Sequence, residues 1–213
     1  MPADQVRHPL FARIYPALSR SEEKAGVTDQ RRLLLAGLSG SVIEVGAGNG
    51  LNFPHYPAEV SRVLAVEPEP RLRALATASA ATAPVPVEVT TGVGERLPAD
   101  DGSFDAAVAG FMLCSVADQG TVLRELLRVL KPGGELRFLE HVRAQTAGLR
   151  RFQRALDATA WPLLLGGCHT GRDTAAAIEH AGFRIERIDR FDLPDSRVPV
   201  PAKPHIRGTA VKA

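Results

Sequence analysis

The sequence predicts an α/β fold built on a doubly wound, mostly parallel sheet. The main observation is the stretch V-I-E-V-G-A-G-N-G at residues 42–50, where an apolar run leads directly into three glycines. Such a run is typical of a buried strand that turns sharply into a helix. Further short apolar runs alternate with helical patterns along the rest of the chain. With 213 residues, the chain is expected to form one domain, residues 1–213.

The spacing of Gly46, Gly48 and Gly50 indicates which ligand the loop accepts. The dinucleotide fingerprint places its third glycine at position 6 of the loop, which here is Leu51. A phosphate-binding loop needs Gly-Lys-Ser/Thr, which this loop lacks. The carboxyl end of the first strand is still the expected nucleotide site. The early third glycine argues against an NAD-dependent oxidoreductase.

Composition excludes several classes of function. Lys+Arg 26 against Asp+Glu 24 gives a net charge of +2, which is too balanced to predict a nucleic-acid partner. Cys114 and Cys168 are the only cysteines, so no disulfide framework is predicted. No apolar run approaches the ~20 residues that span a bilayer, and the N-terminus lacks the apolar core of a signal peptide. These features predict a cytoplasmic protein.

Residues 1–38 are predicted to form a helical lid ahead of the first strand. Residues 5–24 carry apolar side chains at spacings of three and four, which make one helical stripe. We expect this helix to break at Pro16, because proline removes a helical hydrogen bond. Thr28 is expected to cap a following helix over residues 31–38.

Hydrophobic periodicity predicts the elements that follow. One amphipathic helix is expected over residues 149–165, within a helical insertion at 147–170 that covers the cleft. The other predicted helices are 71–81, 121–130 and 172–181, and the other predicted strands are 62–67, 85–90, 104–111, 135–142, 183–192 and 206–212.

The second strand ends in Glu67, and Pro68 then forces a turn. A carboxylate at the tip of this strand accepts hydrogen bonds from both hydroxyls of a ribose. Glu67 is therefore the predicted ribose ligand.

Three features together resemble the class I S-adenosylmethionine (SAM) methyltransferases: the Glu-x-Gly-x-Gly-x-Gly pattern from Glu44, the acidic tip Glu67, and the V-L-K-P-G-G turn at 129–134. The resemblance implies a Rossmann-like, seven-stranded, mostly parallel sheet with an antiparallel last strand. It also implies SAM as the cofactor and S-adenosylhomocysteine as the product. Many members carry Asp or Asn where this chain has Val93. The implied cofactor-binding residues are Glu44, Gly46, Ala47, Gly48, Asn49, Gly50, Asn52, Glu67, Pro68, Val93, Gly94, Glu95, Phe111 and Leu113.

Further segments resemble one subfamily, the thiol S-methyltransferases among the methyltransferase-like proteins. The segments are F-A-R-I-Y, E-V-G-A-G-N-G-L-N-F-P-H-Y-P, L-C-S-V, E-H-V and P-H-I-R-G-T-A-V-K, and they span nearly the whole chain. This resemblance implies methyl transfer from SAM to a small acceptor, with a thiol favoured. Animal members begin with a hydrophobic membrane-anchoring segment, and this chain resembles a soluble relative with no transmembrane segment.

The chemistry of a thiol acceptor points to particular side chains. A thiol has a pKa near ~8.5 and needs only modest help to become a thiolate. His141 and His205 are the candidate proton acceptors. No metal site is expected, because no Cys or His shows paired ligand spacing and the adjacent Cys168 and His169 would point apart. The candidate substrate contacts are Tyr15, Cys114, His141, Trp161 and His169.

Other functions stay open at this point. Soluble lipid N-methyltransferases share the E-V-G-x-G-x-G-L-x-x-x-x-Y-P pattern, and Arg150, Arg151 and Arg154 would give such an enzyme a peripheral contact with anionic lipid. A phenol oxygen or a quinone carbon is another acceptor. A protein that binds SAM without catalysis would also keep the glycine loop and Glu67.

Overall fold

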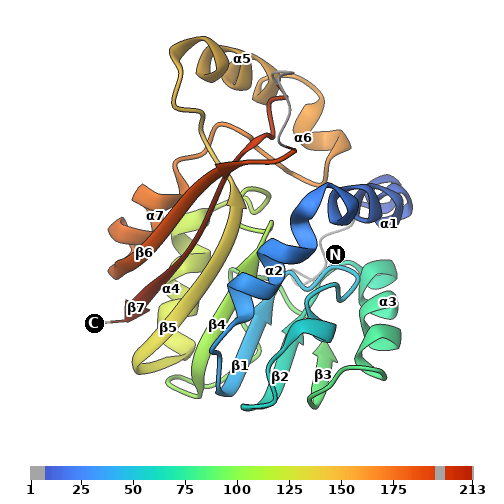
Figure 1. The fold of residues 1–213 in the computed structure, drawn as a ribbon, viewed down its shortest axis with the longest axis vertical. Coiled ribbons are helices and arrows are strands. Elements are labelled where there is room, and N and C mark those ends of the chain that lie inside the picture. Colours follow the sequence, from blue (N-terminus) through green and yellow to red (C-terminus); the bar gives the residue numbers. More distant parts are fainter. Residues whose placement is uncertain (1–7, 195–199, 213) are drawn as a thin grey trace.

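The computed structural model describes residues 8–194 and 200–212, and a seven-stranded sheet runs through its centre (Figure 1). The strand order is β3-β2-β1-β4-β5-β7-β6. β7 runs antiparallel to both of its neighbours, and every other pair is parallel. The Rossmann-like sheet with an antiparallel last strand is therefore confirmed. The strands are β1 (Gly40–Val45), β2 (Val60–Val66), β3 (Val87–Thr90), β4 (Phe104–Gly110), β5 (Leu130–His141), β6 (Phe183–Asp192) and β7 (Pro204–Lys212).

Helices cover both faces of the sheet. Successive strand residues alternate between two apolar clusters, as Val42 and Ile43 do in β1. One cluster joins the sheet to α2 and α3, and the other joins it to α4 and α7. Burial on both faces explains why the central strands read as continuous apolar runs. The α-helices are α1 (Pro9–Glu22), α2 (Thr28–Leu35), α3 (Pro70–Ala80), α4 (Gln119–Val129), α5 (Ala147–Asp157), α6 (Trp161–Leu164) and α7 (Thr174–His180).

The N-terminal helices differ from the prediction in two ways. α1 continues through Pro16, so the expected break is absent. A proline removes one helical hydrogen bond, and the packing of the buried Ala12 and Ser19 on either side keeps the helix intact. Thr28 does not cap α2, because a π-helical turn (Glu23–Val27) joins α1 directly to α2 and Thr28 has helical φ and ψ. Residues 5–7 of the predicted stripe lie outside the described residues.

The predicted helix over 149–165 is two helices, α5 and α6, separated by residues 158–160. Asp157 ends α5, and its carboxylate accepts hydrogen bonds from the N–H groups of Thr170 and Gly171 at 2.8 and 2.9 Å. Pro162 lies in the first turn of α6, a position where its missing N–H costs nothing. In the part of the chain that the structure describes, no helix is both long and apolar enough to cross a bilayer.

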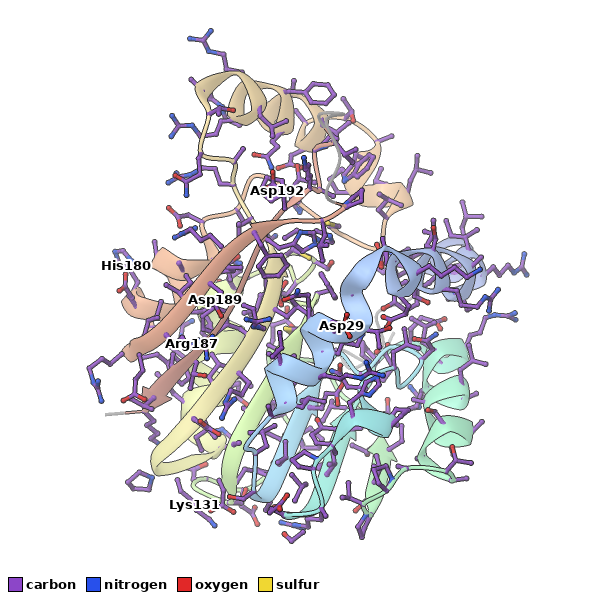
Figure 2. All side chains as sticks on the ribbon, viewed as in Figure 1. Asp29, Lys131, His180, Arg187, Asp189 and Asp192 are labelled. Atoms are coloured by element: carbon purple, nitrogen blue, oxygen red, sulfur yellow. The ribbon has the colours of Figure 1, made fainter. Side chains whose placement is uncertain are left out.

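The carboxyl ends of the parallel strands meet at one end of the molecule, where α1, α5 and α6 lie beyond the sheet (Figure 1). The opposite end carries Lys131, which pairs with Asp105 at 2.6 Å (Figure 2). The carboxyl end is where open α/β sheets bind their ligands.

Candidate active site

The loop after β1 lies between α1 and the turn after β4. Gly46 and Gly48 have φ values of 73° and 58°, a conformation that glycine adopts without strain. A Cβ on Gly46 would lie 2.7 Å from Met112 Cβ, and a Cβ on Gly48 would lie 3.2 Å from the ring of Tyr15. Neither position tolerates a side chain, so a ligand here would meet the backbone itself.

Glu67 follows β2 directly, and its carboxylate is bonded to the glycine loop. Its Oε2 accepts a hydrogen bond from the Gly48 N–H at 2.7 Å, and its Oε1 accepts one from the Glu69 N–H at 2.9 Å. Burial raises the pKa of Glu67 to about 7, against the opposing effect of these hydrogen bonds. Each carboxylate oxygen has a second lone pair, so Glu67 still has acceptor capacity for two hydroxyl groups.

Glu44 lies under the same loop in a buried polar network. The Asn52 amide donates to Glu44 Oε1 at 2.9 Å, and the Tyr56 hydroxyl donates to Oε2 at 2.7 Å. Arg31 of α2 donates in turn to the side-chain oxygen Oδ1 of Asn52 at 3.0 Å. Burial raises the pKa of Glu44 to about 6. This network ties β1 and α2 to the segment after the loop, so it holds the loop in place.

The other predicted cofactor residues gather around this end of the sheet. Val93 and Gly94 are buried, and a Cβ on Gly94 would lie 3.2 Å from Cε of Met112, the residue that also flanks Gly46. The Asn49 amide lies 3.4 Å from the Ser19 hydroxyl, which links the loop to α1. Half-buried residues complete the group, namely Pro68 and Glu95.

The turn after β4 is held from beneath by Glu140. Its buried carboxylate accepts hydrogen bonds from the N–H groups of Met112, Leu113 and Cys114 at 3.0, 2.9 and 3.1 Å. Phe111, which enters the turn, has a φ of 58°, an uncommon value for a bulky residue. The Glu140 side chain is fully buried. It points under the turn because three buried backbone donors require an acceptor there.

We expect Glu140→Ala to lower the free energy of unfolding by about 3 kcal/mol or more. The three buried N–H groups would lose their acceptor, at about 1–3 kcal/mol each. Chemical denaturation followed by circular dichroism measures the change. Glu88→Ala, at an exposed position of β3, is the control and should change stability by less than about 0.5 kcal/mol. Equal losses in the two variants would contradict the role given to Glu140.

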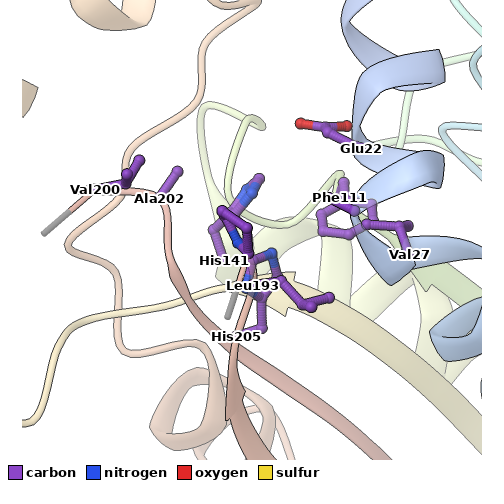
Figure 3. Close-up of a pocket in the computed structure, with 10 residues that line it drawn as sticks. Glu22, Val27, Phe111, His141, Leu193, Val200, Ala202 and His205 are labelled. Atoms are coloured by element: carbon purple, nitrogen blue, oxygen red, sulfur yellow. The ribbon is translucent and has the colours of Figure 1, made fainter. Parts of the chain in front are cut away.

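A cavity of about 130 Å³ lies beside this turn (Figure 3). Its polar side chains are His141, His205 and Glu22, and the rest of its lining is apolar. The apolar lining residues are Ala25, Val27, Phe111, Leu193, Pro194, Val200 and Ala202. The N-terminal helices and the segment before β7 thus enclose the cavity, and the insertion at 147–170 contributes none of these residues.

His141 and His205 come from neighbouring strands and face the cavity together. They are paired in the register of β5 and β7, and their ring centroids are 4.7 Å apart. The ring of Phe111 lies 5.0 Å from His141 and 5.7 Å from His205. Nδ1 of His205 donates to the Lys203 carbonyl at 2.7 Å, which leaves Nε2 as an acceptor. Burial, and next the charge of His141, lower the pKa of His205 to about 3, so this ring is neutral.

Two cysteines lie next to His141. The Sγ atoms of Cys114 and Cys168 are 3.8 and 3.9 Å from His141 Nδ1. Cys114 lies in the turn after β4, and Cys168 lies in the loop after α6. The neighbouring Cys168, and next burial, raise the pKa of Cys114. The expectation of no metal site depended on the spacing of Cys and His along the sequence. Such spacing does not reveal this group, because its three side chains come from three separate segments of the chain.

The remaining predicted substrate residues lie outside the cavity lining. The Tyr15 ring packs over Gly48, next to the glycine loop, and burial raises its pKa to about 12. His169 Nδ1 bonds the Gly167 carbonyl at 2.7 Å. Trp161 has a buried Nε1 for which the described residues provide no hydrogen-bond partner. Of the five predicted contacts, His141 alone lines the cavity.

Glu22 lines the cavity, although the sequence did not predict it as a site residue. It is the last residue of α1, and burial raises the pKa of its carboxyl group. The π-helical turn that follows, with Gly26 at a φ of 110°, bends the chain so that Glu22 faces the cavity. No sequence pattern marks this bend. The sequence therefore gives no reason to place Glu22 in a site rather than on the solvent-exposed surface.

Known proteins resemble this chain in sequence and in fold. Residues 43–138 match the family described as methyltransferase domain. The human thiol S-methyltransferase TMT1A is 38% identical over 183 residues, which cover 83% of this chain and 73% of that protein. The mouse thiol S-methyltransferase TMT1B is 40% identical over 184 residues, 84% of this chain and 74% of that protein. A solved Thermotoga maritima SAM-dependent methyltransferase, described as a possible histamine N-methyltransferase, has a TM-score of 0.70 at 21% identity and covers 96% of this chain and 99% of its own.

The sheet order and the fold are those of a class I SAM-dependent methyltransferase. The chain belongs to the family of the thiol S-methyltransferases TMT1A and TMT1B. It is a SAM-dependent methyltransferase. The site fits that cofactor, because Gly46 and Gly48 have no side chain to hold a ligand away from the backbone and Glu67 has unused acceptor capacity.

Proposed function

We propose that this enzyme methylates a small, apolar thiol. The observation that carries the proposal is the cavity at the carboxyl ends of β4 and β5, in which an apolar lining surrounds His141 and His205. An apolar lining suits a thiol with an alkyl or aryl substituent, and an imidazole can accept the proton that the thiol loses. The relatives TMT1A and TMT1B are named as thiol S-methyltransferases, which supports the same acceptor.

The cofactor roles follow the position of each group. We propose that Glu67 accepts hydrogen bonds from the ribose hydroxyls and that the backbone at 46–50 holds the amino-acid part. Val93, Gly94 and Glu95 would meet the adenine, because Gly94 lies beside Met112, which also flanks Gly46 of the loop. Phe111 and Leu113 border the transferred methyl group. Glu44 and Asn52 act by holding the loop, and Ala47, Asn49 and Pro68 complete its frame.

SAM, when bound, supplies an electrophilic methyl group on a sulfonium. The residues of the chain align the acceptor and remove its proton. A thiol carries one proton, and His141 accepts it, while the neutral His205 ring packs against His141 and forms the next part of the cavity wall. Phe111, Val27 and Leu193 exclude water, which strengthens these polar interactions.

The helices beyond the sheet would control entry. The described part of the N-terminal segment, residues 8–38, would form the lid over the cavity, with Tyr15 against the glycine loop, and the insertion at 147–170 would flank it. A Cβ on Gly166 would lie 2.8 Å from the Phe11 ring, so α1 and the end of the insertion are in contact. Cys114 and Cys168 are both free thiols, in keeping with a cytoplasmic location.

We expect SAM affinity to fall as the pH drops from 8 to 6. Glu67 binds hydroxyl groups best as a carboxylate, and with a pKa of about 7 its ionised fraction falls on acidification. That fraction falls from about 10/11 to about 1/11, so Kd should rise roughly tenfold. Isothermal titration calorimetry at both pH values measures the change. Glu67→Gln removes the titrating group, and an undiminished pH dependence in this variant would contradict the assignment.

An acceptor panel tests the proposed function directly. Purified enzyme and SAM are incubated with alkyl thiols, aryl thiols, phosphatidylethanolamine and a phenol, and S-adenosylhomocysteine release is measured. Release with thiols alone supports the proposal. Release with phosphatidylethanolamine, together with pelleting on anionic vesicles, would favour the lipid alternative. No release with any acceptor, while SAM binds, would overturn the choice of a thiol.

A further inference from the structure

Three soft ligand atoms converge beside the cavity. The Sγ atoms of Cys114 and Cys168 and a ring nitrogen of His141 all lie within 4.8 Å of one another. Among the residues that the structure describes, this is the one such group of three His, Cys, Asp or Glu side chains. The three residues lie far apart in the sequence, so their proximity comes from the fold and not from neighbouring positions along the chain.

The distances between these atoms are close to those of a metal site. In a tetrahedral zinc site with bonds of about 2.3 Å to sulfur and about 2.1 Å to nitrogen, ligand atoms lie about 3.6–3.8 Å apart. The observed Sγ to Nδ1 distances are 3.8 and 3.9 Å. A small movement of the side chains would therefore place all three atoms around one ion.

The hydrogen bonding of His141 differs from that of the other histidines at this end of the chain. Nδ1 of His169, His180 and His205 lies 2.6–2.7 Å from a backbone carbonyl in each case. Within the described residues, Nδ1 of His141 instead faces two sulfur atoms, at distances too long for strong hydrogen bonds. A nitrogen left in this state inside a protein is available as a metal ligand.

The backbone holds the ligands in place. Glu140 fixes the Cys114 N–H at 3.1 Å, and the His169 N–H donates to the Cys114 carbonyl at 2.9 Å. A Cβ on Gly167 would lie 2.4 Å from the Ser115 carbonyl oxygen, so the loop that carries Cys168 is packed tightly against the turn that carries Cys114. Such support from surrounding groups is what positions ligands in metal sites.

We propose that Cys114, His141 and Cys168 bind one Zn²⁺ ion whose fourth position is open to the acceptor sulfur. Thiolate and imidazole ligands select such soft ions, and two thiolates balance the charge of Zn²⁺ in this buried place. Three protein ligands with one open position are the arrangement of catalytic zinc sites.

The second part of this proposal rests on the proposed function. The acceptor S–H bond breaks, its proton leaves to water, and a bond from sulfur to the ion forms. The sulfur then donates an electron pair to the methyl carbon as the bond between that carbon and the sulfonium breaks. His141 is then a ligand, and the charge of the ion does the work of deprotonation described above for the imidazole.

Cobalt binding tests the site without any acceptor. The reduced, full-length enzyme is titrated with Co²⁺, whose thiolate ligands give a charge-transfer band in the near ultraviolet. We expect one equivalent to bind, and Zn²⁺ to displace it. Cys168→Ser and His141→Ala should weaken or remove the band, whereas His180→Ala, on the outer side of α7, should keep it. SAM affinity and circular dichroism establish that each variant is folded. Absence of the band in the wild type, or its survival in folded Cys168→Ser, overturns the site.

Removal of the ion with a chelator tests the role of the ion separately from the proposed thiol methylation. If the ion holds the acceptor, removing it should abolish thiol methylation, and Zn²⁺ should restore it while SAM binding stays unchanged. Thiol methylation that is insensitive to chelation would refute the role of the ion and leave the proposed function standing. Stoichiometric Co²⁺ binding in an enzyme that methylates no thiol would support the ion site and refute the proposed function.

Discussion

Glu67→Ala is expected to weaken SAM binding by about 1.5–3 kcal/mol, the usual loss for a hydrogen bond to a charged group. This corresponds to a rise in Kd of roughly 10- to 160-fold. Glu67 is bonded to the Gly48 N–H, so the variant would lose both the ribose acceptor and a support of the loop. Titration calorimetry with SAM measures the change.

The controls for this variant separate the ribose contact from the loop. Glu88→Ala removes an exposed carboxylate from the neighbouring strand β3 and should leave Kd unchanged. 2′-Deoxyadenosine analogues of SAM lack one ribose hydroxyl and should lose less affinity in the variant than SAM does. An unchanged Kd for SAM in Glu67→Ala would show that the ribose is held elsewhere.

His141→Ala should lower turnover by about 100-fold or more, because a positioned proton acceptor contributes about 10²–10⁴-fold to rate. SAM affinity should stay within about twofold of the wild type, since His141 lies in the acceptor cavity and away from the glycine loop. Steady-state kinetics with the best thiol of the panel and SAM titration measure the two quantities.

His180→Ala is the matched control for His141→Ala. His180 lies at the end of α7, far from the cavity (Figure 2), and its removal should leave turnover unchanged. A His141→Ala enzyme with wild-type turnover would exclude His141 as the proton acceptor and would exclude a catalytic role for an ion that it holds. Rescue of the variant by added imidazole would show that the ring itself acts in turnover.

The sequence predicted the strands well because their signals are local. β6 begins and ends where the periodicity placed it, at Phe183–Asp192, and β7 covers the predicted residues 206–212. The helices were less predictable where tertiary contacts decide their ends. Asp157 turns away from α5 to bond the loop at Thr170 and Gly171, a contact that no helical pattern reveals.

The candidate site also has one part that the sequence predicts and another part that it does not. The glycine loop and Glu67 are marked by motifs, and they lie together in the structure, joined by the bond from the Gly48 N–H. Glu22, Glu140 and the meeting of Cys114 with Cys168 have no such motif. They depend on a π-helical bend, on buried backbone donors, and on two loops that pack together, all of which are properties of the folded chain.

The position of β7 affects the order in which the two halves of the site form. β7 lies between β5 and β6 in the sheet, although it is the last strand in the sequence. His205 belongs to this strand and forms one wall of the cavity beside His141. Chains fold from the N-terminus during synthesis, so the part around β1 and β2 with the glycine loop can form early. The acceptor cavity must wait until residues 204–212 have left the ribosome, and a nascent chain would therefore acquire its cofactor site before its substrate site.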